Sequence, residues 1–287
     1  MAKKLDGTWT QPATAALKVS KGFRLADLDP RSTPGYEGDK ESGQAELAAG
    51  LDRLSDLQER LFASSHVGGA NDSVLLVLQA MDGAGKGGIV RHVVGGVDPQ
   101  GVALAAFKKP TPAELRHDFL WRIEQRLPSP GFIGVFDRSH YEDVLIGRVR
   151  ELASAEEIER RYGAINDFEA RVAESGTRIV KVMLHISPKE QKSRLMERLE
   201  RPDKHWKYNP GDVDERKLWP QYMDAYQTVF ERTSTEVAPW FVIPADRKWF
   251  ARLAVQEILL QTLLDINPRW PKADYDVDAE MARLAAS

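Results

Sequence analysis

Residues 74–88 have the sequence VLLVLQAMDGAGKGG, and this stretch decides the fold of the chain. Its first five residues are a continuous apolar run, typical of a strand that is buried on both faces of a parallel sheet. The glycine-rich turn that follows leads into a helix-like sequence, so backbone N–H groups and the positive end of a helix dipole would meet in one concavity. The stretch therefore predicts a phosphate-binding loop of the P-loop type, formed by Gly83, Ala84, Gly85 and Gly87 with the charge of Lys86.

The turn departs from the G-x-x-x-x-G-K-[ST] pattern at two positions. Ala80 stands in place of the first glycine, and Gly87 replaces the hydroxyl residue that normally ligates Mg²⁺. Asp82 lies inside the loop, where its carboxylate would repel a bound phosphate unless a cation lay between them. We expect Asp82 to be a Mg²⁺ ligand, because one or two carboxylates and phosphate oxygens usually hold this ion. The alternative is a carboxylate that stabilises the turn through hydrogen bonds to loop amides.

Strands and helices alternate along the rest of the chain. Further strands are predicted over 102–107, 132–136, 178–186 and 240–243. Helices are predicted over 45–63, from Thr111 to about Leu127, after the caps Ser154 and Ser187, and over 249–264. This alternation predicts an α/β fold, a three-layer sandwich with a parallel sheet between helices. We expect an N-terminal arm over 1–43, one P-loop domain over 44–270 and a C-terminal tail over 271–287.

A second carboxylate follows the strand predicted over 132–136. Asp137 comes directly after it, and Arg138 follows. Ligands of open α/β sheets lie beyond the carboxyl ends of the strands, so Asp137 would face the glycine-rich turn. We expect Asp82 and Asp137 to hold Mg²⁺ on the phosphates, and Arg138 to neutralise charge on the transferred phosphoryl group. A strand-end aspartate can also cap a helix, so the pattern is strong only together with the turn.

A basic segment follows the strand predicted over 178–186. Residues 189–207 carry seven Lys or Arg and four acids, a net charge of +3 in a chain whose net charge is −3. Arg194, Arg198 and Arg201 would share one face of a helix. We expect a helical lid over about 189–212 that contacts phosphate through these arginines and Lys204. The alternative is a solvated helix face of mixed charge.

Composition excludes several classes of protein. The 287 residues include 40 Lys or Arg, 43 Asp or Glu and no Cys. The near balance of charge excludes a polycationic nucleic-acid binder, and the lack of cysteine excludes disulfides and thiolate sites. No apolar run approaches the ~20 residues of a membrane helix. We expect a soluble, cytoplasmic protein without membrane or nucleic-acid partners, although Trp206 and Tyr208 beside the basic segment leave single-strand binding as an alternative.

From about Leu47 to Pro268 the chain resembles the polyphosphate kinase 2 family. The resemblance rests on motifs in matching order at 81–88, 98–101, 107–110, 117–122, 136–144, 233–236, 238–240, 243–246 and 247–250. It implies a fold like that of thymidylate kinase, and phosphoryl transfer between inorganic polyphosphate and purine nucleotides with Mg²⁺. Family members are commonly homo-oligomers, so the resemblance also implies a dimer or tetramer.

The resemblance also assigns roles to individual residues. It makes Asp82, Lys86, Asp137 and Arg138 catalytic or phosphate-binding, and it makes Arg198 a lid arginine on the polyphosphate. It assigns nucleotide binding to Lys108, Glu142 and Asp143. Tyr141-Glu142-Asp143 is similar to the members that accept nucleoside monophosphates as well as diphosphates, whereas members restricted to diphosphates tend to have Asn in place of Glu142.

Two other functions stay open at this point. An ATP-dependent nucleoside-monophosphate kinase would share the glycine-rich loop, although Gly88 stands where adenylate kinases carry Thr. A non-catalytic nucleotide switch would bind without turnover. The sequence has no Asn-Lys-x-Asp motif for reading guanine, which disfavours the switch.

Overall fold

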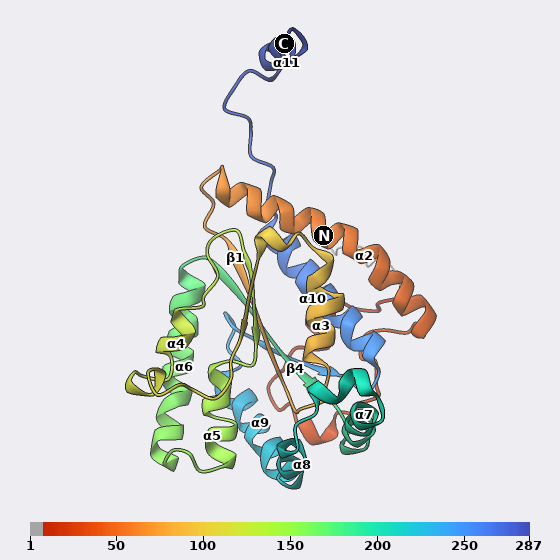
Figure 1. Ribbon diagram of the computed structural model, residues 1–287, viewed down its shortest axis with the longest axis vertical. Helices are drawn as coiled ribbons and strands as arrows, with labels where there is room; N and C mark the ends of the chain where they lie inside the picture. Colours follow the sequence, from red (N-terminus) through yellow and green to blue (C-terminus); the bar gives the residue numbers. More distant parts are fainter. Residues whose placement is uncertain (1–7) are drawn as a thin grey trace.

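The centre of the protein is a parallel sheet of five strands in the order β2-β3-β1-β4-β5 (Figure 1). The structure is a computed structural model that describes residues 8–287. The strands are β1 (Ser73–Ala80), β2 (Val102–Ala106), β3 (Ile133–Asp137), β4 (Thr177–His185) and β5 (Trp240–Pro244). Each overlaps its predicted range, so the predicted α/β fold with a parallel sheet is confirmed.

Side chains of β1 alternate between two hydrophobic cores, one on each face of the sheet. Leu76 and Leu78 pack with α2 (Lys40–His66), α3 (Lys86–His92) and α10 (Lys248–Ile266). Leu75 and Val77 pack with α5 (Ile146–Val149), α6 (Ala155–Glu174) and α9 (Trp219–Thr233). Figure 1 shows α2, α3 and α10 together on one side of the sheet, and α5 and α6 on the other. The result is the predicted three-layer sandwich, with every residue of β1 buried.

The remaining elements are short, apart from one helix. They are α1 (Ala13–Ala16), η1 (Leu25–Asp27), η2 (Val94–Gly96), η3 (Pro99–Gly101), η4 (Glu114–Arg116), α4 (Trp121–Glu124), η5 (His140–Asp143), α7 (Pro188–Glu200), η6 (Pro202–Lys207), α8 (Gly211–Lys217) and α11 (Val277–Ala285). The longest of them is α7, and the predicted cap Ser187 accepts a hydrogen bond from the backbone N–H of Glu190 at its start.

The helix predicted from Thr111 to Leu127 is wrong. Its capping box forms, because Thr111 and Glu114 exchange hydrogen bonds between side chain and backbone. The turn nevertheless stops at Arg116, and a second turn precedes α4, in which the carboxylate of Asp118 accepts the N–H of Leu120 at 3.0 Å. A local hydrogen bond from side chain to backbone thus competes with continuation of the helix.

The two ends of the chain differ in their packing. The carbonyl of Leu17 accepts a hydrogen bond from the N–H of Val242 in β5. The ring of Trp9 lies 5.3 Å from that of Tyr36 and 6.1 Å from that of Phe250. The predicted arm therefore packs on the body from residue 8 onward, while its residues 1–7 lie outside the described part. In contrast, α11 stands clear of the body in Figure 1, and none of its residues is buried.

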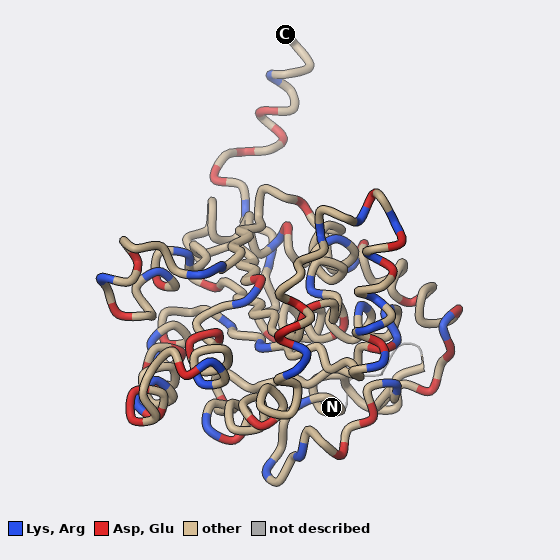
Figure 2. The backbone as a smooth tube through the Cα atoms, turned by 60° about the horizontal axis from the view of Figure 1, so that its bottom comes forward, with Lys and Arg blue, Asp and Glu red and all other residues tan. Residues whose placement is uncertain are grey.

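Charged residues of both signs are distributed along the whole backbone (Figure 2). A local excess of one sign is therefore a feature of a site and not of the whole surface. In the part of the chain that the structure describes, no helix has both the length and the apolar character that crossing a membrane would need.

Candidate active site

The glycine-rich loop lies between β1 and α3, as predicted. Gly83 has φ +81° and Gly85 has φ +121°, backbone angles that favour glycine over any residue with a Cβ atom. Lys86 is the first residue of α3, and its Nζ donates a hydrogen bond to the carbonyl of Ala80 at 3.2 Å. The turn therefore brings its backbone and the ammonium group to one side of the strand end.

The end of β3 meets this loop. Asp137 is the last residue of β3 and pairs in register with Leu78 of β1. Arg138 follows with φ +64°, which is uncommon for a residue other than glycine, and its N–H donates to the carbonyl of Leu78 at 3.0 Å. Its Nη2 lies 2.7 Å from Oδ1 of Asp82. The structure thus brings together Asp82, Asp137 and Arg138, which are far apart in the sequence.

A cavity of about 770 Å³ opens over the loop. In the described part of the chain it is lined by eleven Lys or Arg and only four Asp or Glu, although the chain as a whole carries a charge of −3. The cations are Lys86, Arg91, Lys108, Arg138, Arg194, Arg198, Arg201, Lys204, Lys207, Lys248 and Arg252, and the acids are Asp82, Asp137, Glu197 and Asp212. Such a lining suits a ligand with several negative charges.

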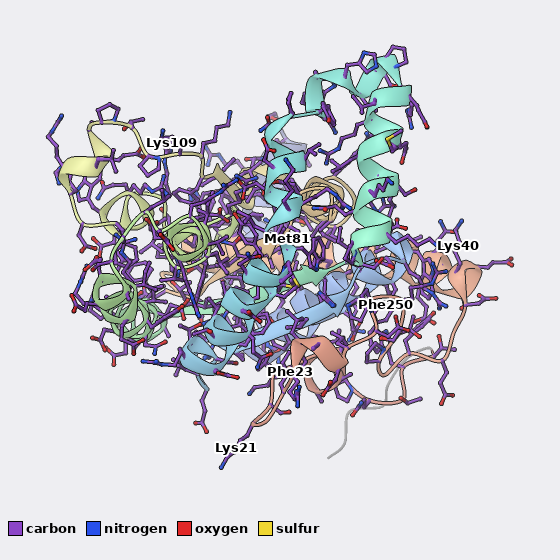
Figure 3. All side chains as sticks on the ribbon, turned by 90° about the horizontal axis from the view of Figure 1, so that it is seen from below. Lys21, Phe23, Lys40, Met81, Lys109 and Phe250 are labelled. Carbon is purple, nitrogen blue, oxygen red and sulfur yellow. The ribbon has the colours of Figure 1, made fainter. Side chains whose placement is uncertain are left out.

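The predicted lid region forms α7, η6 and α8, which rise from the body in Figure 3. Its four predicted cations all line the cavity, but their surroundings differ. Arg194 is buried and donates to backbone carbonyls. Arg198 lies 3.4 Å from a carboxylate oxygen of Asp212, and Arg201 pairs with Glu197 and Asp203. Lys204 lies 3.5 Å from Asp203. The arginines therefore do not present one uniform free face.

Of the three predicted nucleotide-binding residues, only Lys108 lines the cavity. Asp143 lies between Arg122 (3.7 Å) and Arg161 (3.6 Å). Arg122 in turn donates to the carbonyl of Lys108 at 2.8 Å, so Asp143 is linked to the cavity wall through a neighbour. Burial raises the pKa values of both Glu142 and Asp143.

Sequence reasoning missed several residues of the cavity. Asp212 of α8 and Arg252 of α10 come from distant parts of the chain, and only the fold brings them to the loop. Arg91 lies five residues after Lys86 within α3, and this nearness to the loop along the chain was the one signal available from the sequence. Burial and the charges of Arg194 and Arg91 lower the pKa of Arg252. Like charges therefore crowd this end of the cavity.

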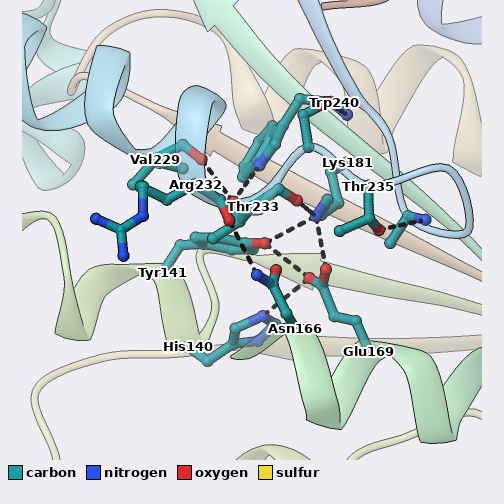
Figure 4. Close-up of polar contacts among 12 residues, drawn as sticks. His140, Tyr141, Asn166, Glu169, Lys181, Val229, Arg232, Thr233, Thr235 and Trp240 are labelled. Atoms are coloured by element: carbon teal, nitrogen blue, oxygen red, sulfur yellow. Dashed lines mark hydrogen bonds and ion pairs between the residues drawn. The ribbon is translucent and has the colours of Figure 1, made fainter. Parts of the chain in front are cut away.

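A buried polar network supports the segment after Arg138 (Figure 4). The ammonium group of Lys181 donates to Glu169 (2.6 Å), to the hydroxyl of Tyr141 (2.9 Å) and to the carbonyl of Thr233 (2.7 Å). The other carboxylate oxygen of Glu169 contacts Tyr141 at 2.8 Å and His140 at 3.3 Å. Lys181 and Glu169 are almost fully buried. The network ties η5 to α6, β4 and the end of α9, and it holds His140 in a packing role.

The donor set at the loop fits Mg²⁺. Asp82 and Asp137 supply hard carboxylate oxygens on the wall of the same cavity, next to a loop suited to phosphate. Within the described residues, no three His, Cys, Asp or Glu side chains form a metal-binding group. Mg²⁺ does not require a complete protein cage, because it is usually held by one or two carboxylates together with substrate phosphates.

Comparisons with known proteins identify chains that are similar to this one. Residues 37–270 match the family described as Polyphosphate kinase 2. The chain is 44% identical over 252 residues to the AMP/ADP-polyphosphate phosphotransferase of Meiothermus ruber, with coverage of 88% of this chain and 92% of the relative. It is 42% identical over 273 residues to the ADP-polyphosphate phosphotransferase of Rhodopseudomonas palustris, with coverage of 90% and 92%.

A solved structure is similar over nearly the whole chain. The crystal structure of polyphosphate kinase 2 from Arthrobacter aurescens TC1 has a TM-score of 0.95 and a sequence identity of 59%. The match covers 97% of this chain and 98% of the other.

Proposed function

This chain belongs to the polyphosphate kinase 2 family, and from that premise we propose that it transfers phosphoryl groups reversibly between inorganic polyphosphate and purine nucleotides. The observation that carries the proposal is the cavity lining, in which eleven cations and four acids of the described residues lie around the glycine-rich loop. A polyphosphate chain carries charge along its length and has no base to be recognised. An extended cationic wall therefore fits this donor better than a pocket that reads a nucleotide.

The proposed catalytic group consists of Asp82, Lys86, Asp137 and Arg138. Lys86 and the loop amides would bind the phosphoryl group while it is transferred. Arg138 would offset the negative charge that spreads over the oxygens of this group. Bound Mg²⁺, with Asp82 and Asp137 as its protein ligands, would reduce repulsion between the two anionic substrates. Transfer then depends mainly on alignment, since the acceptor phosphate itself is the nucleophile.

We propose that the donor chain lies along the end of the cavity that contains Arg91, Lys248 and Arg252. These residues extend the cationic wall beyond Lys86. A bound polyanion would reduce the electrostatic repulsion between the positive charges there. Lid residues Arg198, Arg201 and Lys204 would contact the same chain from α7 and η6.

The proposed acceptors are AMP and ADP, or GMP and GDP. Support comes from Tyr141-Glu142-Asp143 and from the relative of Meiothermus ruber, whose name includes both AMP and ADP. Lys108 on the cavity wall and the Arg122–Asp143 pair behind it would form the acceptor side. Nucleotide acceptors also agree with the predicted cytoplasmic location.

We further propose a homo-oligomer, a dimer or a tetramer. Its support on this chain is the exposed apolar stripe of α11, where Val277, Met281 and Leu284 are 50%, 65% and 76% exposed. Light scattering on the purified protein measures the assembly, and a monomer at all concentrations would contradict it.

The deciding experiment incubates purified protein with Mg²⁺ and long-chain polyphosphate, with AMP and ADP as separate acceptors and without ATP. Chromatography of the nucleotides should show ADP and ATP from AMP, and ATP from ADP. Product from ADP alone would support polyphosphate as the donor and would restrict the acceptors to nucleoside diphosphates. No product from polyphosphate, together with transfer from ATP to AMP in a separate reaction, would overturn the proposal in favour of an ATP-dependent nucleoside-monophosphate kinase.

A further inference from the structure

The first half of α7 holds three consecutive carbonyl groups of the glycine-rich loop. Nε2 of Gln191 donates to the carbonyl of Asp82 at 2.7 Å. Nη1 of Arg194 donates to the carbonyls of Gly83 (3.2 Å) and Ala84 (2.6 Å). The loop thus has α7 against its carbonyl side, and this contact joins residues more than 100 positions apart in the sequence.

The guanidinium of Arg194 is fully occupied by protein acceptors. Besides the two loop carbonyls, Nη2 donates to the carbonyls of Ala245 (2.6 Å) and Asp246 (3.2 Å), and Nε donates to Glu190 (2.8 Å). A guanidinium has five N–H groups, so these five acceptors use all of them. The side chain is only 6% exposed. Arg194 therefore has no donor left for a phosphate, although it lies at the cavity wall.

The orientation of Gln191 is fixed in its turn. Nη1 of Arg216 in α8 donates to Oε1 of Gln191 at 2.5 Å and to the carbonyl of Pro188 at 3.0 Å. Because the amide oxygen of Gln191 accepts from Arg216, its NH₂ group faces the carbonyl of Asp82. The contact from α8 through α7 to the loop is continuous.

These contacts determine which groups of the loop face the cavity. The peptide unit is planar and trans, so its C=O and N–H point in opposite directions. Carbonyls of Asp82 and Ala84 that are held on α7 turn the N–H groups of Gly83 and Gly85 away from α7, toward the cavity that both glycines line. A carbonyl turned the other way would place a partial negative charge against phosphate oxygens.

We infer that Gln191 and Arg194 are positioning residues that orient the phosphate-binding loop, and that the first half of α7 is a fixed brace rather than part of the moving lid. This inference rests on the proposed function, because it assumes that the loop binds phosphate. The sequence predicted that Arg194 contacts phosphate directly. We infer instead that Arg194 acts on phosphate binding indirectly, by holding the loop carbonyls. Motion of the lid then begins beyond Arg194, in the part of α7 that carries Arg198.

The test compares Arg194→Lys with Arg194→Ala and measures the affinity for tripolyphosphate by calorimetry, together with kcat and KM for polyphosphate. Lysine keeps the positive charge but lacks the planar arrangement of five donors. If Arg194 orients the loop, both variants should lose affinity about tenfold or more. Guanidinium at a non-denaturing concentration should restore part of the affinity in Arg194→Ala, a recovery that a general loss of stability would not give.

Controls make the result decisive. Lys192→Ala changes an exposed cation of the same helix outside the cavity lining, and it should bind tripolyphosphate like the wild type. Gln191→Ala removes a single loop contact, and it serves as the test if the Arg194 variants fail to fold. It should also weaken binding of tripolyphosphate while the protein stays folded.

Wild-type affinity in Arg194→Lys, or the absence of guanidinium rescue in a folded Arg194→Ala, would overturn the inference. Neither result would touch the proposed function, which fails only if the wild-type protein makes no nucleotide from polyphosphate.

Discussion

Arg138 and Asp82 form an ion pair, with 2.7 Å between Nη2 and Oδ1, that joins the end of β3 to the loop after β1. Burial acts to lower the pKa of Arg138, but the charges of Glu142, Asp82 and Asp137 outweigh it and raise the pKa, so the guanidinium stays charged. The left-handed backbone conformation of Arg138 costs free energy, and the contacts around the residue hold it in place. The pair keeps a charged arginine at the cavity wall, ready for an anionic ligand.

Replacing either carboxylate of the site should remove most activity while the protein stays folded. We expect Asp82→Asn and Asp137→Asn each to lower kcat about 100-fold or more, because Asn lacks the charge that would hold Mg²⁺ and balance Arg138. Melting temperatures should stay within a few degrees of the wild type, since both side chains lie at the cavity and not in a core. Initial rates with polyphosphate and ADP measure the effect. Near-normal rates in either variant would remove the proposed metal site.

Gly85→Ala should impair the loop through its backbone. A Cβ atom at Gly85 would meet only a side-chain atom of Arg194 at 3.7 Å, so there is room for it. The φ of +121° is nevertheless strained for alanine, at a cost of about 1–3 kcal/mol. We expect a lower free energy of unfolding in urea and a higher KM for polyphosphate.

A matched control for Gly85→Ala lies in α6. A Cβ atom at Gly163 would contact nothing within 4 Å, and the residue is helical and exposed. Gly163→Ala should therefore stabilise the protein by about 0.5–1 kcal/mol and leave KM unchanged. Equal effects of the two substitutions would contradict the role of the left-handed turn.

The buried ion pair of Lys181 and Glu169 should contribute strongly to stability. Lysine at 2.6 Å holds the pKa of Glu169 below its usual range, against burial, which acts to raise it. Lys181→Met would leave a buried carboxylate without its counter-charge and should lower the free energy of unfolding by about 3–5 kcal/mol. Adding Glu169→Gln should recover part of this loss, because the double variant buries no charge. Urea denaturation at neutral pH measures both, and a double variant no more stable than the single one would refute the explanation.

The sequence predicted the part of the site that follows from strand topology. The carboxyl ends of neighbouring parallel strands lie at one edge of a sheet, so Asp82, Asp137 and Arg138 could be placed together from the chain alone. Asp212 could not be placed this way, because its position depends on how α8 packs after the sheet is formed.

Helical periodicity has a different limit. The spacing of Arg194, Arg198 and Arg201 predicts a shared direction on a helix, but not which atoms that direction meets. Only the packed structure shows that the loop carbonyls have taken the donors of Arg194. Similarly, the capping box at Thr111 predicts the start of a helical turn, but it does not predict that the turn ends at Arg116 or that Asp118 forms a separate turn with Leu120.

Removal of residues 271–287 should leave the stability of the body unchanged. No residue of α11 is buried. Pro268 is the one buried residue between Asn267 and the end of the described chain. We expect the melting temperature of a protein truncated after Trp270 to stay within about 2 °C of the wild type at high dilution. A large decrease there would show that the tail belongs to the folded domain, and a decrease only in a concentrated sample would point to a contact between copies.

Asp212 should make stability depend on pH. Its side chain is 8% exposed and lies 3.4 Å from Arg198, and burial, with the charge of Asp82, raises its pKa from 3.8 to about 6. Between these two values the native state binds a proton that the unfolded state does not. The resulting stabilisation is complete below the unfolded pKa and is lost as the pH rises through about 6.

Asp212→Asn removes this dependence, because the amide stays neutral at every pH. The free energy of unfolding of the variant, relative to the wild type, should therefore increase by about 1–3 kcal/mol between pH 4 and pH 7. Asp214→Asn is the matched control, since Asp214 is an exposed carboxylate of the same helix whose pKa Lys217 lowers. Urea denaturation across this range measures both differences. If the difference for Asp212→Asn stays constant with pH, the buried carboxylate is ionised throughout, and the Arg198–Asp212 pair is a permanent ion pair of the lid.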